Sequence, residues 1–236
     1  MNDVVYLKLQ RPDPESMRRA SRIAVSDLYE ALPAESRERA LMSSRIRPLI
    51  SGVRIAGPAV TARCAPNDNL MMHQALLIAE PGDVLVVDGG TPSAAQWGYL
   101  AAVYAKKKGI SGVVIEGCIR DVDALVEHRS PVWFRDISPA HPEKKGAGAV
   151  NVSVLCGGVP VRPGDLVCAD ADGVLVVRRE DVETVVAAAE RRASHEAAAV
   201  EAIQAGQSLF DIHGLAAAIE ASGSKVIDGA WTEETH

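Results

Sequence analysis

Apolar runs alternate with amphipathic segments through much of the chain. The run at 84–88 is apolar up to its last residue, which predicts a strand buried on both faces. A second run of small and β-branched residues at 111–116 predicts another buried strand. The segment from about Ala94 to Lys108, closed by Gly109, predicts a helix between them. A strand, a helix and a strand with short connections predict a right-handed βαβ unit.

The flanking segments carry helix and hairpin signals. Asp13 is followed by a proline and an acid, which predicts the start of a helix. After residue 145, glycines and a Pro-Gly-Asp turn punctuate short β segments, as in hairpins. A long Ala/Glu/Arg helix is predicted from about 180 to 205, and a last helix over about 209–222. We expect one α/β domain over residues 1–236, whose helical extension at about 180–223 packs on a neighbouring subunit.

Charge and composition exclude some classes of partner. The chain of 236 residues has a formal net charge of −6, and its single basic cluster, Lys106–Lys108, ends a predicted helix, where cations complement the helix dipole. A nucleic-acid surface needs a basic patch, so no nucleic-acid partner is expected. No apolar run approaches the ~18 residues of a membrane span, and the N-terminus lacks a leader pattern. We expect a soluble, cytoplasmic protein with no membrane partner.

Four cysteines without a C-x-x-C spacing predict buried free thiols rather than a zinc site or disulfides; they are Cys64, Cys118, Cys156 and Cys168.

The candidate chemistry lies where the strand at 111–116 ends. Arg120 carries a permanent charge and a fork of donors, suited to a substrate carboxylate or an enolate oxygen. A structural ion pair is an equal alternative. Asp121 suits Mg²⁺ or Mn²⁺, which need few protein ligands, although it could instead cap the helix that follows.

The start of the predicted helix offers backbone donors. If Gly98 to Ala101 form its first turn, their N–H groups point at an anion. Gly98 alone is better explained as a small residue for close packing. By position alone, His73 is a core or rim residue, His141 lacks a partner pattern, and Glu196 lies on a solvated helix face.

Several motifs together resemble a known superfamily. They are the segments 81–90, 97–98, 108–115 and 117–123, including the spacing of 22 between Gly98 and Arg120 and the Arg-Asp pair. The superfamily contains the regulator of ribonuclease activity A and the 4-hydroxy-4-methyl-2-oxoglutarate / 4-carboxy-4-hydroxy-2-oxoadipate aldolases. The similarity runs from about Val25 to Gly206. The Pro-Val-Trp motif ending at Trp133 and the long tail are more similar to the aldolases.

The resemblance implies a layered α/β/β/α sandwich of the swivelling β/β/α type, assembled as trimers or hexamers with sites between subunits. It implies that Arg120 contacts the substrate, that Asp121 holds the metal, and that Glu196 of an adjacent subunit reaches a metal-bound water. It also implies that a pyruvate-like carboxylate is bound by the backbone of Gly98, Tyr99, Leu100 and Ala101. Where the aldolases have an acid after the glycine, this chain has Tyr99, whose hydroxyl adds no charge.

The resulting hypothesis is a divalent-metal-dependent lyase that cleaves a 4-hydroxy-2-oxo acid to pyruvate and a second oxo-acid. A metal-bound water, poised by Glu196 and Tyr99, would take the proton of the C4 hydroxyl. Oxaloacetate decarboxylation is an expected side activity because it passes through the same enolate. The alternatives are a non-catalytic regulator that binds a ribonuclease or another protein, and a related metal-dependent lyase with a different substrate.

Overall fold

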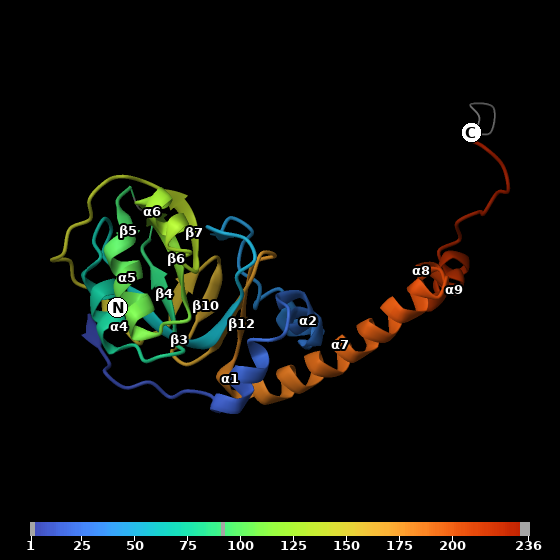
Figure 1. The fold of residues 1–236 in the computed structure, drawn as a ribbon, viewed down its shortest axis with the longest axis horizontal. Coiled ribbons are helices and arrows are strands. Elements are labelled where there is room, and N and C mark those ends of the chain that lie inside the picture. Colours follow the sequence, from blue (N-terminus) through green and yellow to red (C-terminus); the bar gives the residue numbers. More distant parts are fainter. Residues whose placement is uncertain (1–2, 91–92, 232–236) are drawn as a thin grey trace. The chain divides into compact units, whose positions relative to one another are not determined.

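The computed structural model describes residues 3–90 and 93–231, whose course Figure 1 shows. The strands are β1 (Val4–Val5), β2 (Arg47–Pro48), β3 (Ile55–Arg63), β4 (Val84–Asp88), β5 (Ala95–Trp97), β6 (Gly112–Ile119), β7 (Val132–Ile137), β8 (Ala149–Val150), β9 (Val154–Cys156), β10 (Val159–Val161), β11 (Leu166–Ala169) and β12 (Val174–Val177). The helices are α1 (Pro14–Ala20), α2 (Val25–Ala31), α3 (Ala34–Arg37), α4 (Leu70–Ile78), α5 (Tyr99–Lys108), α6 (Val122–Glu127), α7 (Val182–Gln204), α8 (Leu209–Ile212) and α9 (Leu215–Ala221).

A mixed sheet forms the centre of the fold. Strands β3, β4, β6 and β7 pair in parallel in that order, and β5 pairs in parallel with the carboxyl end of β6. Antiparallel strands extend the sheet, with β2 beside β7, and β8 and β11 beside β3. Ligands in open parallel sheets bind at the carboxyl ends of the strands, so the end of β6 is the first place to look for a site.

Successive side chains of β4 enter two different cores, because side chains alternate across a strand. Leu85 and Val87 pack in a core that also holds buried residues of α4, α5 and α6. Val84 and Val86 belong to a second core, which includes Val174 and other residues of β9 to β12. The central strands are therefore covered by helices on one face and by β structure on the other.

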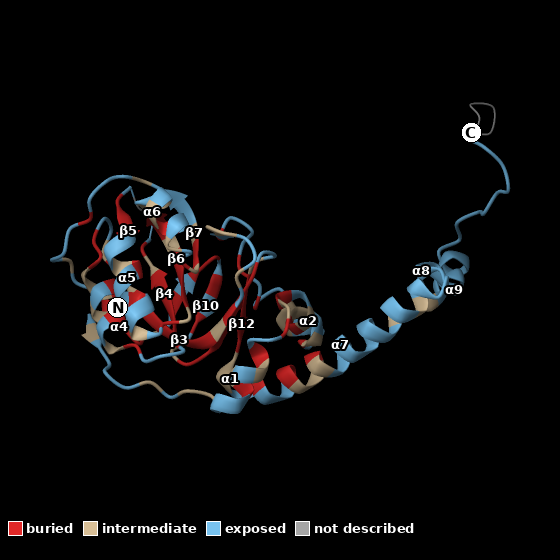
Figure 2. Cartoon of the chain, in the orientation of Figure 1, coloured by how far each residue is buried: buried red, intermediate tan, exposed pale blue. Residues whose placement is uncertain are grey.

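The hairpin of β11 and β12 supplies the next layer. Val174 and Val176 belong to the core between the β layers, whereas Leu175 and Val177 pack with α1, α2 and the start of α7. Figure 2 shows the buried strands with helices on both sides of them. This order of layers confirms the predicted α/β/β/α sandwich. All four cysteines are free and buried, as predicted.

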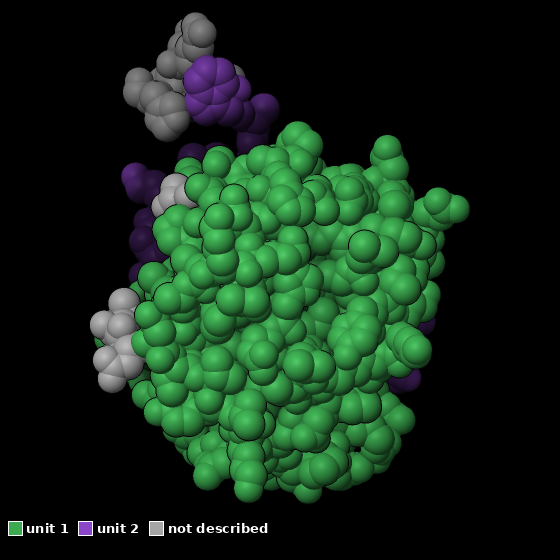
Figure 3. All heavy atoms as spheres, turned by 90° about the vertical axis from the view of Figure 1, so that its left-hand side faces the viewer, with its two compact units in different colours: residues 1–191 green, residues 192–236 purple. Residues whose placement is uncertain are grey.

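The chain forms two compact units, residues 1–191 and 192–236, coloured separately in Figure 3. In the first unit, α7 begins with a buried face that ends at Ala189. In the second unit, which holds the rest of α7 with α8 and α9, none of the described residues is buried. No helix in the described part of the chain has both the length and the apolar character needed to cross a membrane.

Two predicted helices are wrong in their extent. The helix expected from about Ala94 begins at Tyr99, because Ala95–Trp97 form β5 beside the end of β6. The expected last helix at 209–222 is divided into α8 and α9 at Gly214, whose φ of 61° lies in the left-handed region. The predicted start of α1 is confirmed, since the Asp13 side chain accepts a hydrogen bond from the Ser16 N–H.

Candidate active site

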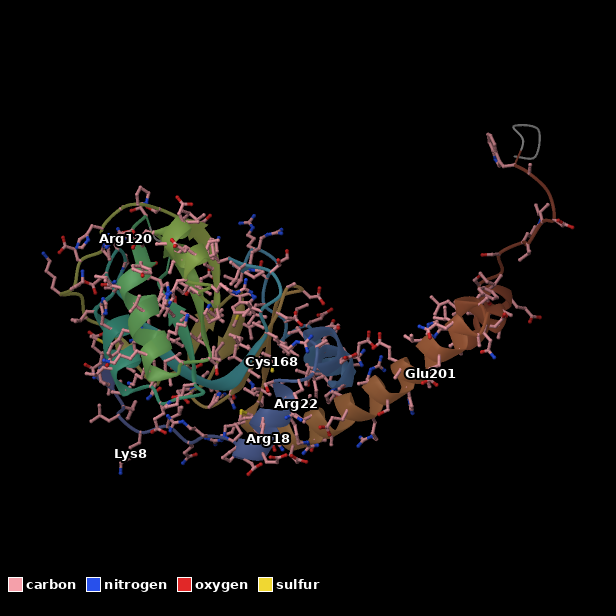
Figure 4. All side chains as sticks on the ribbon, in the orientation of Figure 1. Lys8, Arg18, Arg22, Arg120, Cys168 and Glu201 are labelled. Atoms are coloured by element: carbon pink, nitrogen blue, oxygen red, sulfur yellow. The ribbon has the colours of Figure 1, made fainter. Side chains whose placement is uncertain are left out.

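A cleft of about 750 Å³ opens where β6 ends, near the Arg120 side chain labelled in Figure 4. The β5–β6 pairing creates it, since the N–H of Arg120 donates to the carbonyl of Trp97 at 3.0 Å. This contact brings the start of α5 beside the Arg-Asp pair. Six residues predicted to form the site line this cleft, namely Gly98, Tyr99, Leu100, Ala101, Arg120 and Asp121.

Asp121 links α5 to α6. Its Oδ2 accepts a hydrogen bond from the backbone N–H of Tyr99, the first residue of α5, at 3.0 Å. Asp121 also occupies the N-cap position of α6, but its side chain makes no capping hydrogen bond there. The alternative in which Asp121 caps its own helix is therefore wrong, because the carboxylate is turned towards the other helix and the cleft.

Gly98 makes room for this carboxylate. Its φ of −161° is extended backbone, so conformational freedom does not explain the glycine. A β-carbon at this position would lie 2.6 Å from Asp121 Oδ2 and 3.2 Å from Arg120 Cγ. The first N–H groups of a helix lack intrahelical acceptors, and Gly98 has no side chain to cap them. The N–H groups of Leu100 and Ala101 are therefore available to an anion in the cleft.

Arg120 reaches the same cleft with weak internal contacts. Within the described residues, its ion pair is with its neighbour Asp121, where Nε and Oδ2 are 3.7 Å apart. Its Nη1 lies 3.3 Å from Nδ1 of His141. The Arg120 side chain is 36% exposed, so its guanidinium keeps donors for a carboxylate or an oxyanion. Among the described residues, no tight ion pair accounts for this arginine.

Two buried amide side chains in the lining were missed by the sequence analysis. The side-chain nitrogen of Asn69 donates to the backbone carbonyl of Gln96, and Oε1 of Gln96 accepts from the N–H of Cys118. Their other polar atoms, Asn69 Oδ1 and Gln96 Nε2, are buried without a hydrogen-bond partner in the part of the chain that the structure describes. Such groups need a partner, so they suit a polar ligand. The sequence signal that could have identified Gln96 is an amide side chain within the otherwise apolar sequence 94–97.

Lys144 adds a positive charge to the cleft, and two histidines lie in its lining. His73, His141 and Lys144 line it, together with a second carboxylate, Asp123. Burial lowers the pKa of His73, and the charge of Lys144 lowers it further, so His73 is neutral at pH 7. The sequence analysis left both histidines without a role, and the structure brings them into the same cleft.

Glu196 is not among the residues that line the cleft, and it is an exposed residue of α7 in the second unit. The described residues contain no group of three or more His, Cys, Asp or Glu side chains that could hold a metal ion. The carboxylates available in the cleft are those of Asp121 and Asp123.

Known sequences and structures are similar to this chain over most of its length. A model of the RraA-like family, described as Aldolase/RraA, matches residues 25–176. A protein of Halalkalibacterium halodurans, provisionally named 4-hydroxy-4-methyl-2-oxoglutarate aldolase, is 39% identical over 163 residues, which cover 69% of this chain and 78% of that protein.

Two crystal structures resemble the fold. The Streptomyces coelicolor protein RraAS2, described as an unusual member of the RNase ES inhibitor RraA family, has a TM-score of 0.70 and 30% identity. The match covers 81% of this chain and 98% of that one. An uncharacterised protein of Pseudomonas syringae has a TM-score of 0.75 and 25% identity, with 86% and 99% of the two chains covered.

Proposed function

The chain belongs to the RraA-like (Aldolase/RraA) family, and from this we propose that it is a lyase that cleaves a 4-hydroxy-2-oxo acid to pyruvate and a second oxo-acid. The observation that carries the proposal is the meeting of Arg120, Asp121 and the first turn of α5 in one cleft. This arrangement offers a fixed cation, a carboxylate and open backbone donors within reach of one small ligand. The provisional name of the Halalkalibacterium halodurans relative supports the same reaction.

The substrate would be held by its oxo-acid end. We propose that the N–H groups of Leu100 and Ala101 bind the C1 carboxylate, which the positive end of the α5 dipole also favours. Arg120 donates hydrogen bonds to the 2-oxo oxygen. When the C3–C4 bond breaks, its electron pair moves onto that oxygen as an enolate, so the contacts of Arg120 strengthen in the transition state.

We also propose a divalent cation, Mg²⁺ or Mn²⁺, at Asp121. The backbone N–H of Tyr99 donates to Oδ2 of Asp121, but the Asp121 side chain is 43% exposed. Asp121 lines the cleft, as does Asp123. Mg²⁺ is commonly held by one or two carboxylates and several waters, so this donor set fits such an ion without a cage of protein ligands. The ion would supply Lewis-acid polarisation of the 2-oxo group.

Cleavage also requires a base for the C4 hydroxyl. We propose that a water molecule held by the Tyr99 hydroxyl and by Glu196 of a second copy accepts this proton. The C4 oxygen then becomes the carbonyl of the second oxo-acid, and protonation of the enolate at C3 gives pyruvate. Oxaloacetate would lose CO₂ through the same enolate, which makes decarboxylation an expected second activity.

The contribution of Glu196 requires a homo-oligomer, which we propose to be a trimer or a hexamer. In the second unit, exposed apolar side chains include Val200, Ile203, Leu209, Phe210, Leu215, Ile219, Val226, Ile227 and Trp231. Extended exposed apolar surface is typical of protein–protein contacts, so a second copy is the proposed partner of these helices. We propose the cytoplasm as the compartment, since free thiols persist where glutathione keeps them reduced.

The test is pyruvate release from oxaloacetate and from 4-hydroxy-4-methyl-2-oxoglutarate by metal-free protein. Mg²⁺ or Mn²⁺ should switch on release, and EDTA should abolish it. If neither substrate yields pyruvate with either ion, a panel of other 4-hydroxy-2-oxo acids decides whether the substrate differs. Inactivity across that panel rejects the lyase.

A regulatory protein is the second candidate, because the similar Streptomyces coelicolor structure is described within a family of ribonuclease inhibitors. Such a protein would bind a ribonuclease and would lower its RNA cleavage. A variant Arg120→Gln separates the two candidates, since it should abolish turnover, whereas binding of a protein partner elsewhere on the surface should persist.

A further inference from the structure

A second cavity shares Trp97 with the cleft. This rear cavity has a volume of about 310 Å³ and lies against the C-terminal half of α5 and the turn after α6. Trp97 is the single lining residue common to both cavities among the described residues. The volume of the rear cavity is at the lower end of the range of roughly 300–1,000 Å³ that is typical of small-molecule pockets.

Two residues that line the rear cavity each carry a buried polar atom without a hydrogen-bond partner in the described part of the chain. Trp97 is 2% exposed, and its indole Nε1 has no hydrogen-bond partner within the described residues. The same is true of Nε2 of His128, which also lines the rear cavity. By contrast, the indole N–H of the equally buried Trp133 donates to the carbonyl of Asp170 at 2.8 Å. An unpaired buried donor costs stability, so Trp97 calls for an acceptor that the described chain does not supply.

The other lining residues indicate which kind of ligand the rear cavity would accept. Ala102, Ala105, Ile110, Val113 and Pro131 provide apolar walls.

Two exposed cations, Lys106 and Arg129, also belong to the lining. Neither forms an ion pair with an acid in the described part of the chain. The rear cavity is therefore lined by apolar side chains that include the ring of Trp97, by a residue with a buried unpaired donor, and by two positive charges.

We propose that the rear cavity is a second binding site, for a small aromatic carboxylate. Its ring would pack against Trp97 and the alanines of α5, and one carboxylate oxygen would accept the indole N–H of Trp97. His128 would donate to the other oxygen in the tautomer that carries the proton on Nε2. Lys106 and Arg129 favour the negative charge of the ligand over a neutral analogue.

The test uses benzoate as the probe and the tryptophan indole N–H signals of ¹⁵N-labelled protein as the readout. Benzoate should shift the Trp97 signal in a saturable manner and leave the Trp133 signal in place, because the latter indole already has its acceptor. Benzamide, which is neutral, should bind about tenfold more weakly, a loss of about 1.4 kcal/mol. Equal shifts of both indoles, or none, would reject the site.

Variants locate the binding. Ala105→Leu fills the rear cavity and should abolish the shift, and Lys106→Gln with Arg129→Asn should weaken it severalfold without touching the core. Asparagine is chosen because Arg129 has a left-handed φ of 53° that this residue tolerates. Arg120→Gln, on the cleft side of Trp97, should leave benzoate affinity unchanged. Loss of binding in Arg120→Gln, or unaltered binding in both rear-cavity variants, would assign the benzoate to the cleft and overturn the proposal.

Discussion

Oδ2 of Asp121 and the backbone nitrogen of Tyr99 are 3.0 Å apart, although 22 positions separate them in sequence. This hydrogen bond joins the first residue of α5 to the residue that begins the turn into α6. It fixes the carboxylate proposed to hold a metal relative to the N–H groups proposed to hold a substrate. Substitutions that break this hydrogen bond, or that add a side chain at Gly98, should therefore affect both binding events.

Gly98→Ala should weaken Mn²⁺ binding and turnover together. The new β-carbon would lie 2.6 Å from Asp121 Oδ2, so the carboxylate must move, and a displacement of about 1 Å can cost about 100-fold in rate. Calorimetric titration with Mn²⁺ and a pyruvate assay measure the two effects. Gly229→Ala is the matched control, since its nearest atom would be 3.8 Å away. Normal metal affinity in Gly98→Ala would show that the close approach is tolerated.

Arg120→Lys should keep the fold and lose most turnover. Lysine replaces the planar fork by a point charge, and we expect a loss of about 2–4 kcal/mol of transition-state stabilisation, as for other removed oxyanion donors. Turnover beside a thermal melt tests this. Arg18→Lys, in an exposed pair with Glu15, is the control for the same chemical change. Full turnover in a folded Arg120→Lys protein would remove this arginine from the mechanism.

Asp121→Asn should separate the two contacts of this side chain. Asparagine can still accept the Tyr99 N–H, and it tolerates the left-handed φ of 59° found here, so the melting temperature should change little. A hard dication prefers a charged oxygen, so calorimetry should show weaker Mn²⁺ binding. Wild-type affinity for Mn²⁺ would leave Asp121 with only its hydrogen bond to α5.

Acid should loosen the segment that carries His141 and Lys144. Burial alone would raise the pKa of Asp68, but the N–H groups of Leu70, Lys145 and Gly146 outweigh it and hold that pKa below 3.8. A carboxyl with a depressed folded pKa stabilises the fold above its unfolded pKa. That contribution is present above pH 3.8 and disappears as the pH falls through the folded pKa.

Chemical denaturation between pH 5 and about 2.5 measures this dependence. Asp68→Asn, which cannot ionise, should lose less stability over this interval than the parent chain. Asp211→Asn is a comparison in the second unit, where Asp211 is exposed. Parallel pH profiles for Asp68→Asn and the parent would contradict the assignment.

Mixed chains should show whether sites are shared. Asp121→Ala and Glu196→Ala should each be inactive alone, and mixing them should restore some turnover, since some sites would have both wild-type residues. Closed rings with heterologous interfaces allow such complementation. Mass spectrometry should confirm that mixed oligomers form. Mixed oligomers that remain as inactive as their parents, or a fully active monomer, would reject the shared site.

The layered sandwich was implied by the family resemblance, whereas the βαβ unit and the Arg-Asp pair were predicted from local patterns. The apolar run at 84–88 and the pair of Arg120 and Asp121 are each legible from a few adjacent residues. The hydrogen-bond partner of Asp121 could not be predicted in this way, because the contact with Tyr99 depends on how β5 lies beside β6. The same pairing explains why residues 95–97, which continue a helical pattern in sequence, form a strand.

Buried polar contacts were the least predictable part of the site. An amide among apolar neighbours singles out Gln96, but the sequence does not show that Asn69 and Gln96 each leave one polar atom unpaired within the described residues, since that depends on the groups that surround them in the fold. The break at Gly214 was similarly hidden, because a glycine inside an apolar helical pattern is compatible with a continuous helix.

The hairpin of β11 and β12 has no solvent side, since its alternate residues belong to two different cores. A polar side chain introduced at Val174 or Leu175 would be buried whichever way it faced. In the neighbouring hairpin of β9 and β10, Leu155 and Pro160 are exposed. Under random mutation with selection for folding, we therefore expect β11 and β12 to accept only a few types of aliphatic residue. Positions 155 and 160 should accept many residue types.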